Sequence, residues 1–305
     1  MRKTYPSDYS AGLVHITFQR RRCSSNHHSK VIGYYKFFIM GDHLEVVKIL
    51  EYRGYKLILL KDLKVRRGVL VQGLPGIGLV GKIAVDYIVD NLQLEKIAEL
   101  IGPGMLLPIG NAGVFVDGVG QLQLPSYKFY LYQGADSDIV FLTSDIQPAS
   151  WAQFDVAEAV LEFSTSIGIE SVISVCGTSS ESSEVVVVYA VAKTLRENDL
   201  QSLGIRRSSG GTITGACGLL PALASLRGLE GIVIMGSTQT PEPNLESARE
   251  VIRILSKILN LNISFEKLDE MIEEDKARRK ELERGLAETE EKTSEKKEAL
   301  PNWYV

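Results

Sequence analysis

The chain has 305 residues, of which 45% are hydrophobic and 24% are charged, and its formal net charge is −4. This composition is typical of a globular protein with a sizeable core, and the mildly acidic balance argues against a general attraction to nucleic acid or to anionic membranes. No apolar run is long enough to cross a membrane, and the chain has no signal-peptide pattern. Its three cysteines, Cys23, Cys176 and Cys217, give no disulfide framework, so we expect a protein of the reducing cytoplasm.

Residues 1–39 differ from the rest of the chain in charge. They hold seven Lys and Arg side chains and the single acid Asp8, a formal charge of +6, which leaves −10 for the remainder. They have no clear hydrophobic period, whereas Met40 opens a stretch that is typical of the first residues of a protein. We interpret 1–39 as a basic N-terminal extension, either a disordered arm or a stretch upstream of the natural start.

Short apolar runs alternate with helical patterns from about residue 55 to residue 260. Runs rich in Val and Ile predict strands at 55–60, 68–73, 96–101, 113–118, 127–134, 138–144, 171–177, 185–191 and 231–237. Amphipathic stretches between them predict helices at 78–91, 151–167, 194–203, 213–227 and 243–259. Because several strands are apolar throughout, we predict an α/β domain over 40–262 with a largely parallel central sheet and helices on both faces.

The composition changes again after Asn262. Ser264 can cap a helix that is mostly charged and whose apolar seam fades towards its end, so we predict a charged helix or linker over 263–300. Pro301 ends this helix, and the short segment 301–305 follows.

Two aromatic residues close the chain, Trp303 and Tyr304, followed by Val305. Aromatic side chains on a solvated tail would be exposed unless they docked on another surface. That surface could belong to the protein's own core or to a partner. The long charged helix between the domain and the tail favours a partner, in which apolar slots take the aromatic rings and a cation or backbone amides take the terminal carboxylate.

A glycine-rich stretch at 73–82, GLPGIGLVGK, matches two nucleotide-binding patterns, the dinucleotide G-x-G-x-x-G and the start of a P-loop. The residues of these patterns are Gly76, Gly78, Gly81 and Lys82. A P-loop needs Ser or Thr after its lysine, but Ile83 stands there, and no acid ends the next strand as dinucleotide binding requires. We interpret the stretch as a tight strand-to-helix turn, with a weak anion-binding loop as the alternative.

Catalytic patterns are scarce. No histidine occurs from residue 44 to residue 305, which excludes histidine-based triads and metal sites from the α/β domain. Asp117 and Asp145 follow predicted strands, where α/β active sites gather, but we favour turn-forming roles for both. Cys176 and Cys217 are interpreted as buried small hydrophobes. We therefore predict no catalytic residue, no metal and no cofactor.

Four segments carry a resemblance to a known family, both in their residues and in their order along the chain: GLPGIGLVGKIAVDYIV, SDIQP, GGTITGACGLL and LRGLEGIVIMGST. On these residues the stretch from about 55 to 262 resembles the proteasome assembly chaperone 2 family, in its archaeal branch. The terminal WYV resembles the hydrophobic–tyrosine–any-residue tail with which proteasome regulators and chaperones dock on the core particle. The first 39 residues match nothing in the family.

The resemblance implies a phosphorylase-like α/β fold, homo-oligomers or assembly with a paralogous subunit, and ATP-independent, non-enzymatic binding to the α-ring of the 20S core particle. Trp303 would then pack between adjacent α-subunits, Tyr304 would take the tyrosine position, and the Val305 carboxylate would pair with a pocket lysine. Two alternatives stay open. One is a nucleotide-binding enzyme, similar to an ATP-dependent ligase, that uses the loop 73–82. The other is a general chaperone that holds unfolded clients on an apolar surface.

Overall fold

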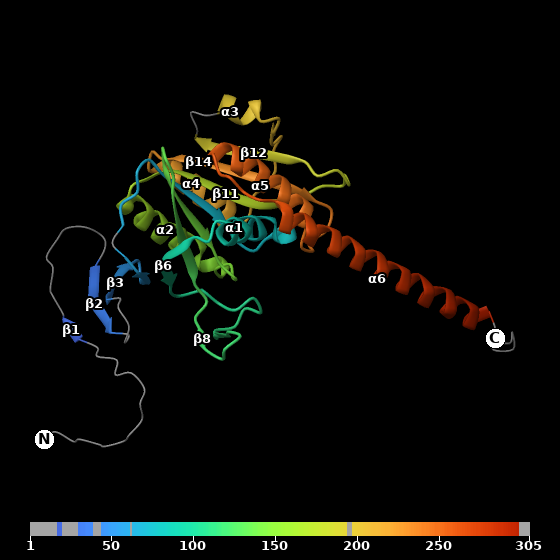
Figure 1. The fold of residues 1–305 in the computed structure, drawn as a ribbon, viewed down its shortest axis with the longest axis horizontal. Helices are drawn as coiled ribbons and strands as arrows, with labels where there is room; N and C mark the ends of the chain where they lie inside the picture. Colours follow the sequence, from blue (N-terminus) through green and yellow to red (C-terminus); the bar gives the residue numbers. More distant parts are fainter. Residues whose placement is uncertain (1–16, 20–29, 39–43, 62, 194–196, 299–305) are drawn as a thin grey trace, which may run out of the picture. The chain divides into compact units, whose positions relative to one another are not determined.

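A computed structural model describes residues 17–19, 30–38, 44–61, 63–193 and 197–298 (Figure 1). The chain divides into two compact units, Met1–Asn260 and Leu261–Val305. None of the helices in the described segments has the length and apolarity needed to span a bilayer.

One large sheet forms the centre of the first unit. Its strands stand in the order β1-β2-β3-β4-β6-β9-β10-β5-β11-β14-β12-β13. Their bounds are β1 Thr17–Gln19, β2 Lys30–Phe38, β3 Leu44–Tyr52, β4 Tyr55–Leu59, β5 Gly68–Gly73, β6 Glu95–Ile101, β9 Tyr127–Gln133, β10 Asp138–Thr143, β11 Ile169–Ser179, β12 Val187–Lys193, β13 Arg206–Arg207 and β14 Glu230–Thr238. A separate hairpin pairs β7, Phe115–Val116, with β8, Leu122–Gln123.

Helices connect the central strands. Those of the first unit are α1 Val80–Asn91, α2 Gln153–Ile167, α3 Glu197–Ser202, α4 Ala216–Leu226 and α5 Leu245–Leu259, with short 3₁₀ turns η1 at Ile77–Leu79 and η2 at Ser150–Ala152. The second unit contains α6, Glu266–Glu298.

Two glycines of β14 place the helices on the two faces of the sheet. Side chains alternate along a strand, so Gly231 and Gly236 face opposite ways. A Cβ atom on Gly231 would lie 2.2 Å from the carbonyl oxygen of Pro221 in α4, whereas one on Gly236 would lie 2.3 Å from Ser247 Oγ in α5. Because α2 packs beside α4 and α1 beside α5, helices cover both faces, which confirms the α/β class.

The sheet is mixed. The central strands β10, β5, β11 and β14 run parallel to one another, whereas β3, β4, β6 and β9 on one side and β12 on the other pair in antiparallel fashion. The predicted parallel arrangement thus describes the centre. Short connections explain two of the antiparallel pairs: residues 134–137 join β9 to β10, and a two-residue turn at Arg53 and Gly54, where both residues have positive φ, joins β3 to β4.

The core lies where the central strands meet the helices. β5 and β10 are buried along their whole length, as their continuous apolar runs predict. The rings of Phe129 in β9 and Phe163 in α2 meet edge to face, with centroids 5.1 Å apart, and tie the antiparallel side to the helical layer.

The predicted domain boundaries are not settled by this architecture. β2 lies within the predicted extension 1–39, yet it pairs with β3, which begins at Leu44. The division between the two units falls after Asn260. The boundaries after residues 39 and 262 stay predictions.

Candidate functional site

The glycine-rich loop lies at the edge of the sheet where the parallel strands end. β5 ends at Gly73, and its parallel neighbours β10 and β11 end at Thr143 and Ser179 on the same edge. The chain then turns through η1 into α1. Ligands of open α/β sheets bind outside this carboxyl edge, which makes it the first place to look for a site.

The glycines allow α1 to lie directly on the strands. A Cβ atom on Gly73 would lie 2.1 Å from the carbonyl oxygen of Gly81, and one on Gly81 would lie 2.0 Å from the carbonyl oxygen of Val175 in β11. Gly78 has a φ of +61°, in the left-handed region. At Gly76, by contrast, the nearest atom would be 4.0 Å away. The prediction of a tight, closely packed strand-to-helix turn is confirmed.

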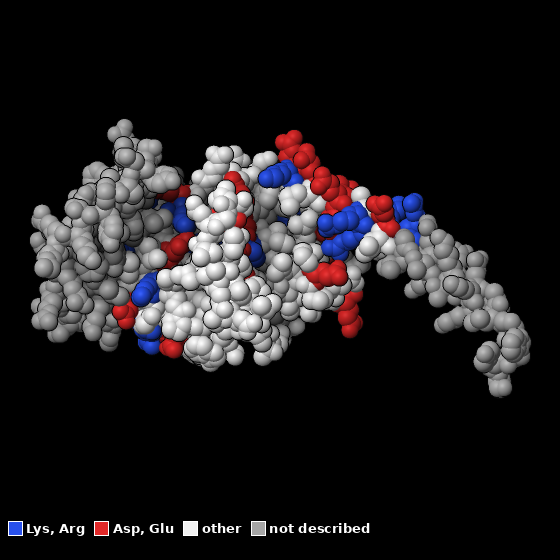
Figure 2. Space-filling view, turned by 90° about the horizontal axis from the view of Figure 1, so that it is seen from below, with Lys and Arg blue, Asp and Glu red and all other residues white. Residues whose placement is uncertain are grey.

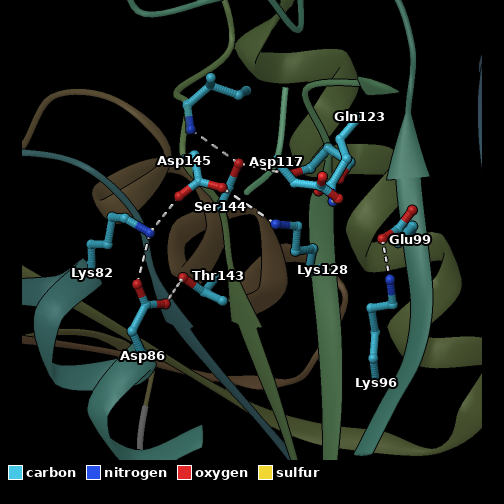
Figure 3. A network of polar contacts seen from close by, with 12 residues as sticks. Lys82, Asp86, Lys96, Glu99, Asp117, Gln123, Lys128, Thr143, Ser144 and Asp145 are labelled. Carbon is cyan, nitrogen blue, oxygen red and sulfur yellow. Dashed lines mark hydrogen bonds and ion pairs between the residues drawn. The ribbon is translucent and has the colours of Figure 1, made fainter. Parts of the chain in front are cut away.

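The lysine of the P-loop pattern is held by two carboxylates. Lys82 Nζ lies 2.7 Å from Asp86 Oδ2 and 2.9 Å from Asp145 Oδ1 (Figure 3). Asp145 Oδ2 also accepts a hydrogen bond of 3.3 Å from Lys128 Nζ, and Asp86 Oδ1 accepts one of 2.5 Å from Thr143 Oγ1. The cluster joins α1 to the start of β9 and the end of β10.

These contacts set the charges of the cluster. Burial acts to lower the pKa of Lys82, but hydrogen bonds and charge from Asp86 and Asp145 outweigh it, so the pKa lies above its ordinary value. Burial acts to raise the pKa of Asp145, but Lys82 and Lys128 outweigh it and hold that pKa below its ordinary value. Both groups are therefore charged at neutral pH.

This geometry suits an ion-pair anchor better than a phosphate cradle. A P-loop lysine has to reach the phosphates of a nucleotide, whereas the ammonium of Lys82 is neutralised by carboxylates of the protein. On the neighbouring strand β6, Glu99 Oε1 lies 2.5 Å from Lys96 Nζ, so this acid is engaged in an ion pair of its own.

The two aspartates after predicted strands have different roles. Asp117 forms a turn, because its Oδ1 accepts hydrogen bonds of 3.0 Å and 2.8 Å from the backbone N–H groups of Val119 and Gln121. The prediction of a turn is confirmed there. For Asp145 the turn interpretation is wrong about the main contacts, because this side chain bridges two lysines.

Cys176 in β11 and Cys217 at the start of α4 form a disulfide, with their Cα atoms 6.4 Å apart. Both residues are buried, as predicted, but the expectation of two unpaired cysteines is wrong. They are 41 residues apart in the sequence, and the packing of α4 on β11 brings them together. The pair lines a cleft of about 310 Å³ that it shares with the glycine-rich loop and with Gln147 and Thr178.

A second feature of the carboxyl edge is apolar and was not singled out from the sequence. The connection between β6 and β9, residues 102–126, contains one ionisable residue, Asp117. Its large apolar side chains that are more than half exposed are Ile109, Val116, Val119, Leu122 and Leu124. The sequence signal for this apolar surface was a 25-residue stretch with one charged side chain. We call residues 102–126 the β6–β9 connection.

The predicted docking residues Trp303, Tyr304 and Val305 lie outside the described residues, which end at Glu298 in α6. Their contacts stay a prediction.

The chain is an α/β protein with a mixed central sheet, helices on both faces of that sheet and a glycine-rich turn into α1. A family model described as the PAC2 family matches residues 70–283, and the chain belongs to this family. The uncharacterized protein MJ1210 of Methanocaldococcus jannaschii is 29% identical over an alignment of 217 residues, which covers 68% of this chain and 81% of that protein.

Two solved structures from Pyrococcus furiosus resemble the chain. The crystal structure of PbaB, an archaeal proteasome activator, matches with a TM-score of 0.69 and 27% identity over 76% of this chain and 99% of PbaB. A crystal structure of PbaA, an archaeal homolog of proteasome-assembly chaperone, matches with a TM-score of 0.59 and 28% identity over 74% of this chain and 96% of PbaA. The resemblance to the archaeal branch of the family is confirmed.

Proposed function

We propose that this protein is a non-enzymatic, cytoplasmic proteasome assembly chaperone or proteasome-binding protein. In this proposal Trp303, Tyr304 and Val305 dock in pockets between α-subunits of the 20S core particle. The observation that carries the proposal is membership of the PAC2 family together with the similarity to PbaB and PbaA. The occupied lysine of the glycine-rich loop supports it over the nucleotide-binding enzyme.

The helix α6 suits the role of a spacer. Its 33 residues correspond to a rod about 50 Å long. Leu268 and Ile272 are buried, whereas the described side chains from 273 to 284 are exposed apart from the half-buried Asp275. Asp275 forms an ion pair of 2.6 Å with Arg279 one turn later, which supports a helix in solvent.

A single tail is a small ligand and binds weakly, because association costs translational and rotational freedom that a few side chains barely offset. Several tails on one assembly gain affinity through their effective concentration around a ring with several pockets. The proposal therefore includes self-association, or association with a paralogous subunit.

Removal of the tail tests the proposal. We expect Tyr304→Ala, and deletion of 303–305, to reduce co-purification with tagged 20S core particles at least about tenfold, since an aromatic anchor supplies much of a small interface's energy. Lys280→Ala, an exposed change in α6, is the control and keeps binding. Thermal melting of all variants stays that of the wild type. Undiminished recovery with the tail deleted would refute the docking mechanism.

A further inference from the structure

The β6–β9 connection exposes more apolar surface than its own fold can cover. It leaves the carboxyl edge of the sheet, since β6 ends at Ile101 and the first residues of β9 pair with the end of β10. Trp151, 68% exposed, adjoins its base, where a Cβ atom on Gly104 would lie 3.1 Å from the indole ring. β8 lies at the bottom of Figure 1, and Figure 2, viewed from that side, shows a central surface with few charges.

The hairpin within this connection is too small to support itself. β7 and β8 contribute two residues each, and their pairs are Phe115 with Gln123 and Val116 with Leu122. Isolated two-stranded hairpins are marginal in water even when they are longer. Phe115 packs towards the core, but Val116 and Leu122 are 65% and 73% exposed. The outer side of the hairpin is therefore uncovered.

An apolar groove lies beside the exposed side chains. It has a volume of about 680 Å³, and its apolar lining includes Ile101, Pro103, Met105, Val114, Leu124 and Pro125. A protruding apolar hairpin and an apolar groove thus occur side by side on one chain. Two identical copies can bury both features at once.

The low charge of the connection also favours a second copy of the chain as its partner. The sole carboxylate of the connection, Asp117, accepts three hydrogen bonds from its own turn and from Gln123. Two copies can therefore bring their connections together without like-charge repulsion, and the one charged side chain that lines the adjoining groove is the exposed Lys56 of β4.

The area is of the right order for an interface. Side chains of this size each carry an apolar area on the order of 60–120 Å², so the five exposed side chains and Trp151 supply several hundred Å². Monomers rarely expose contiguous apolar patches larger than about 300–600 Å², and a standard interface buries about 800 Å² per partner. The exposed side chains and the groove would form the apolar centre of such an interface.

We propose that the β6–β9 connection is the self-association surface of this protein, and that the connection of one copy packs on the connection and adjoining groove of a second copy. This inference rests on the proposed function in one respect, because an assembly of copies presents several tails to one ring.

Light scattering coupled to gel filtration of the full chain tests it. We expect the wild type to elute with at least twice the mass of one chain. We expect Val119→Asp and Leu122→Asp each to raise the dissociation constant roughly tenfold or more, because each buries a charge in place of an apolar side chain. Val119 and Leu122 are exposed in one copy, so both variants keep the wild-type circular dichroism spectrum.

Leu226→Asp is the matched control. Leu226 is 83% exposed at the end of α4 and lies near the opposite, amino edge of the sheet, just before β14. We expect this variant to keep the wild-type mass, and deletion of 303–305 to keep it as well while binding to proteasomes is lost. A monomeric wild type, unchanged assembly in the two connection variants, or equal loss in Leu226→Asp would each overturn the inference without bearing on the tail.

Discussion

The contacts of Lys82 favour a structural role for the glycine-rich loop over nucleotide binding. Its ammonium lies between Asp86 and Asp145, within 3 Å of an oxygen of each. Charge-assisted pairs of this kind are strong when they are partly desolvated, and 21% of the Lys82 side chain is exposed. The lysine therefore anchors α1 to the edge of the sheet, and a nucleotide would have to displace two carboxylates to reach it.

The cluster makes a prediction about pH. The folded-state pKa of Asp145 lies below its ordinary value of 3.8, so its contribution to stability is present above that value and is lost as pH falls through the folded pKa. We expect Asp145→Asn to lower the free energy of unfolding by about 0.5–1 kcal/mol at neutral pH, a modest effect because solvent screens a half-exposed side chain.

Urea unfolding at a series of pH values measures this difference, which we expect to shrink below pH 3.8. Asp136→Asn, a change at an exposed aspartate, serves as the control with little effect. A difference between wild type and Asp145→Asn that stays constant down to acid pH would rule out the ion pair as its source.

The contact between α1 and the strands makes a second prediction. We expect Gly81→Ala to cost at least about 1–3 kcal/mol in the free energy of unfolding, because the new methyl group would overlap the carbonyl oxygen of Val175 and the helix would have to move. Gly76→Ala is matched to it, since both glycines belong to the same motif and Gly76 has open space. Thermal denaturation compares the two, and equal losses would contradict close packing as the reason for Gly81.

The link between β11 and α4 makes a third prediction. Closing a chain segment of 41 residues stabilises the folded state by about 4 kcal/mol in the chain-entropy account. We expect Cys217→Ser to lower the free energy of unfolding by up to that amount. We expect reducing agent to lower the free energy of unfolding of the wild type by the same amount. Thiol titration of denatured, unreduced protein should find one free thiol among the three cysteines. Three free thiols would refute the bond.

Local patterns allowed much of this fold to be predicted. The strand predicted at 68–73 is β5, Gly68–Gly73, and the helix predicted at 243–259 contains α5, Leu245–Leu259, because continuous apolar runs and amphipathic periods act locally. The strand β3 was not predicted, because charged residues interrupt the alternation of its apolar side chains. It forms because the turn at Arg53 and Gly54 places it beside β4, with which it pairs. Long-range features, namely the disulfide and the pairing of Lys82 with Asp145, depend on strand order, which the sequence does not reveal.

The two proposals assign a separate role to each part of the chain. The α/β unit would assemble copies through the β6–β9 connection, α6 would act as a spacer, and the tail at 303–305 would bind the ring. Each part then has a separate test, because substitutions in the connection change the mass of the assembly whereas substitutions in the tail change only the binding of its target.

Electron microscopy of the protein mixed with isolated α-rings and with complete 20S core particles tests the central claim most directly. We expect wild-type protein to decorate the outer face of the α-ring, with density in the pockets between adjacent α-subunits, and Tyr304→Ala to leave the rings bare. Rings that stay undecorated by the wild type, or that the tail-deleted chain decorates equally, would contradict the account.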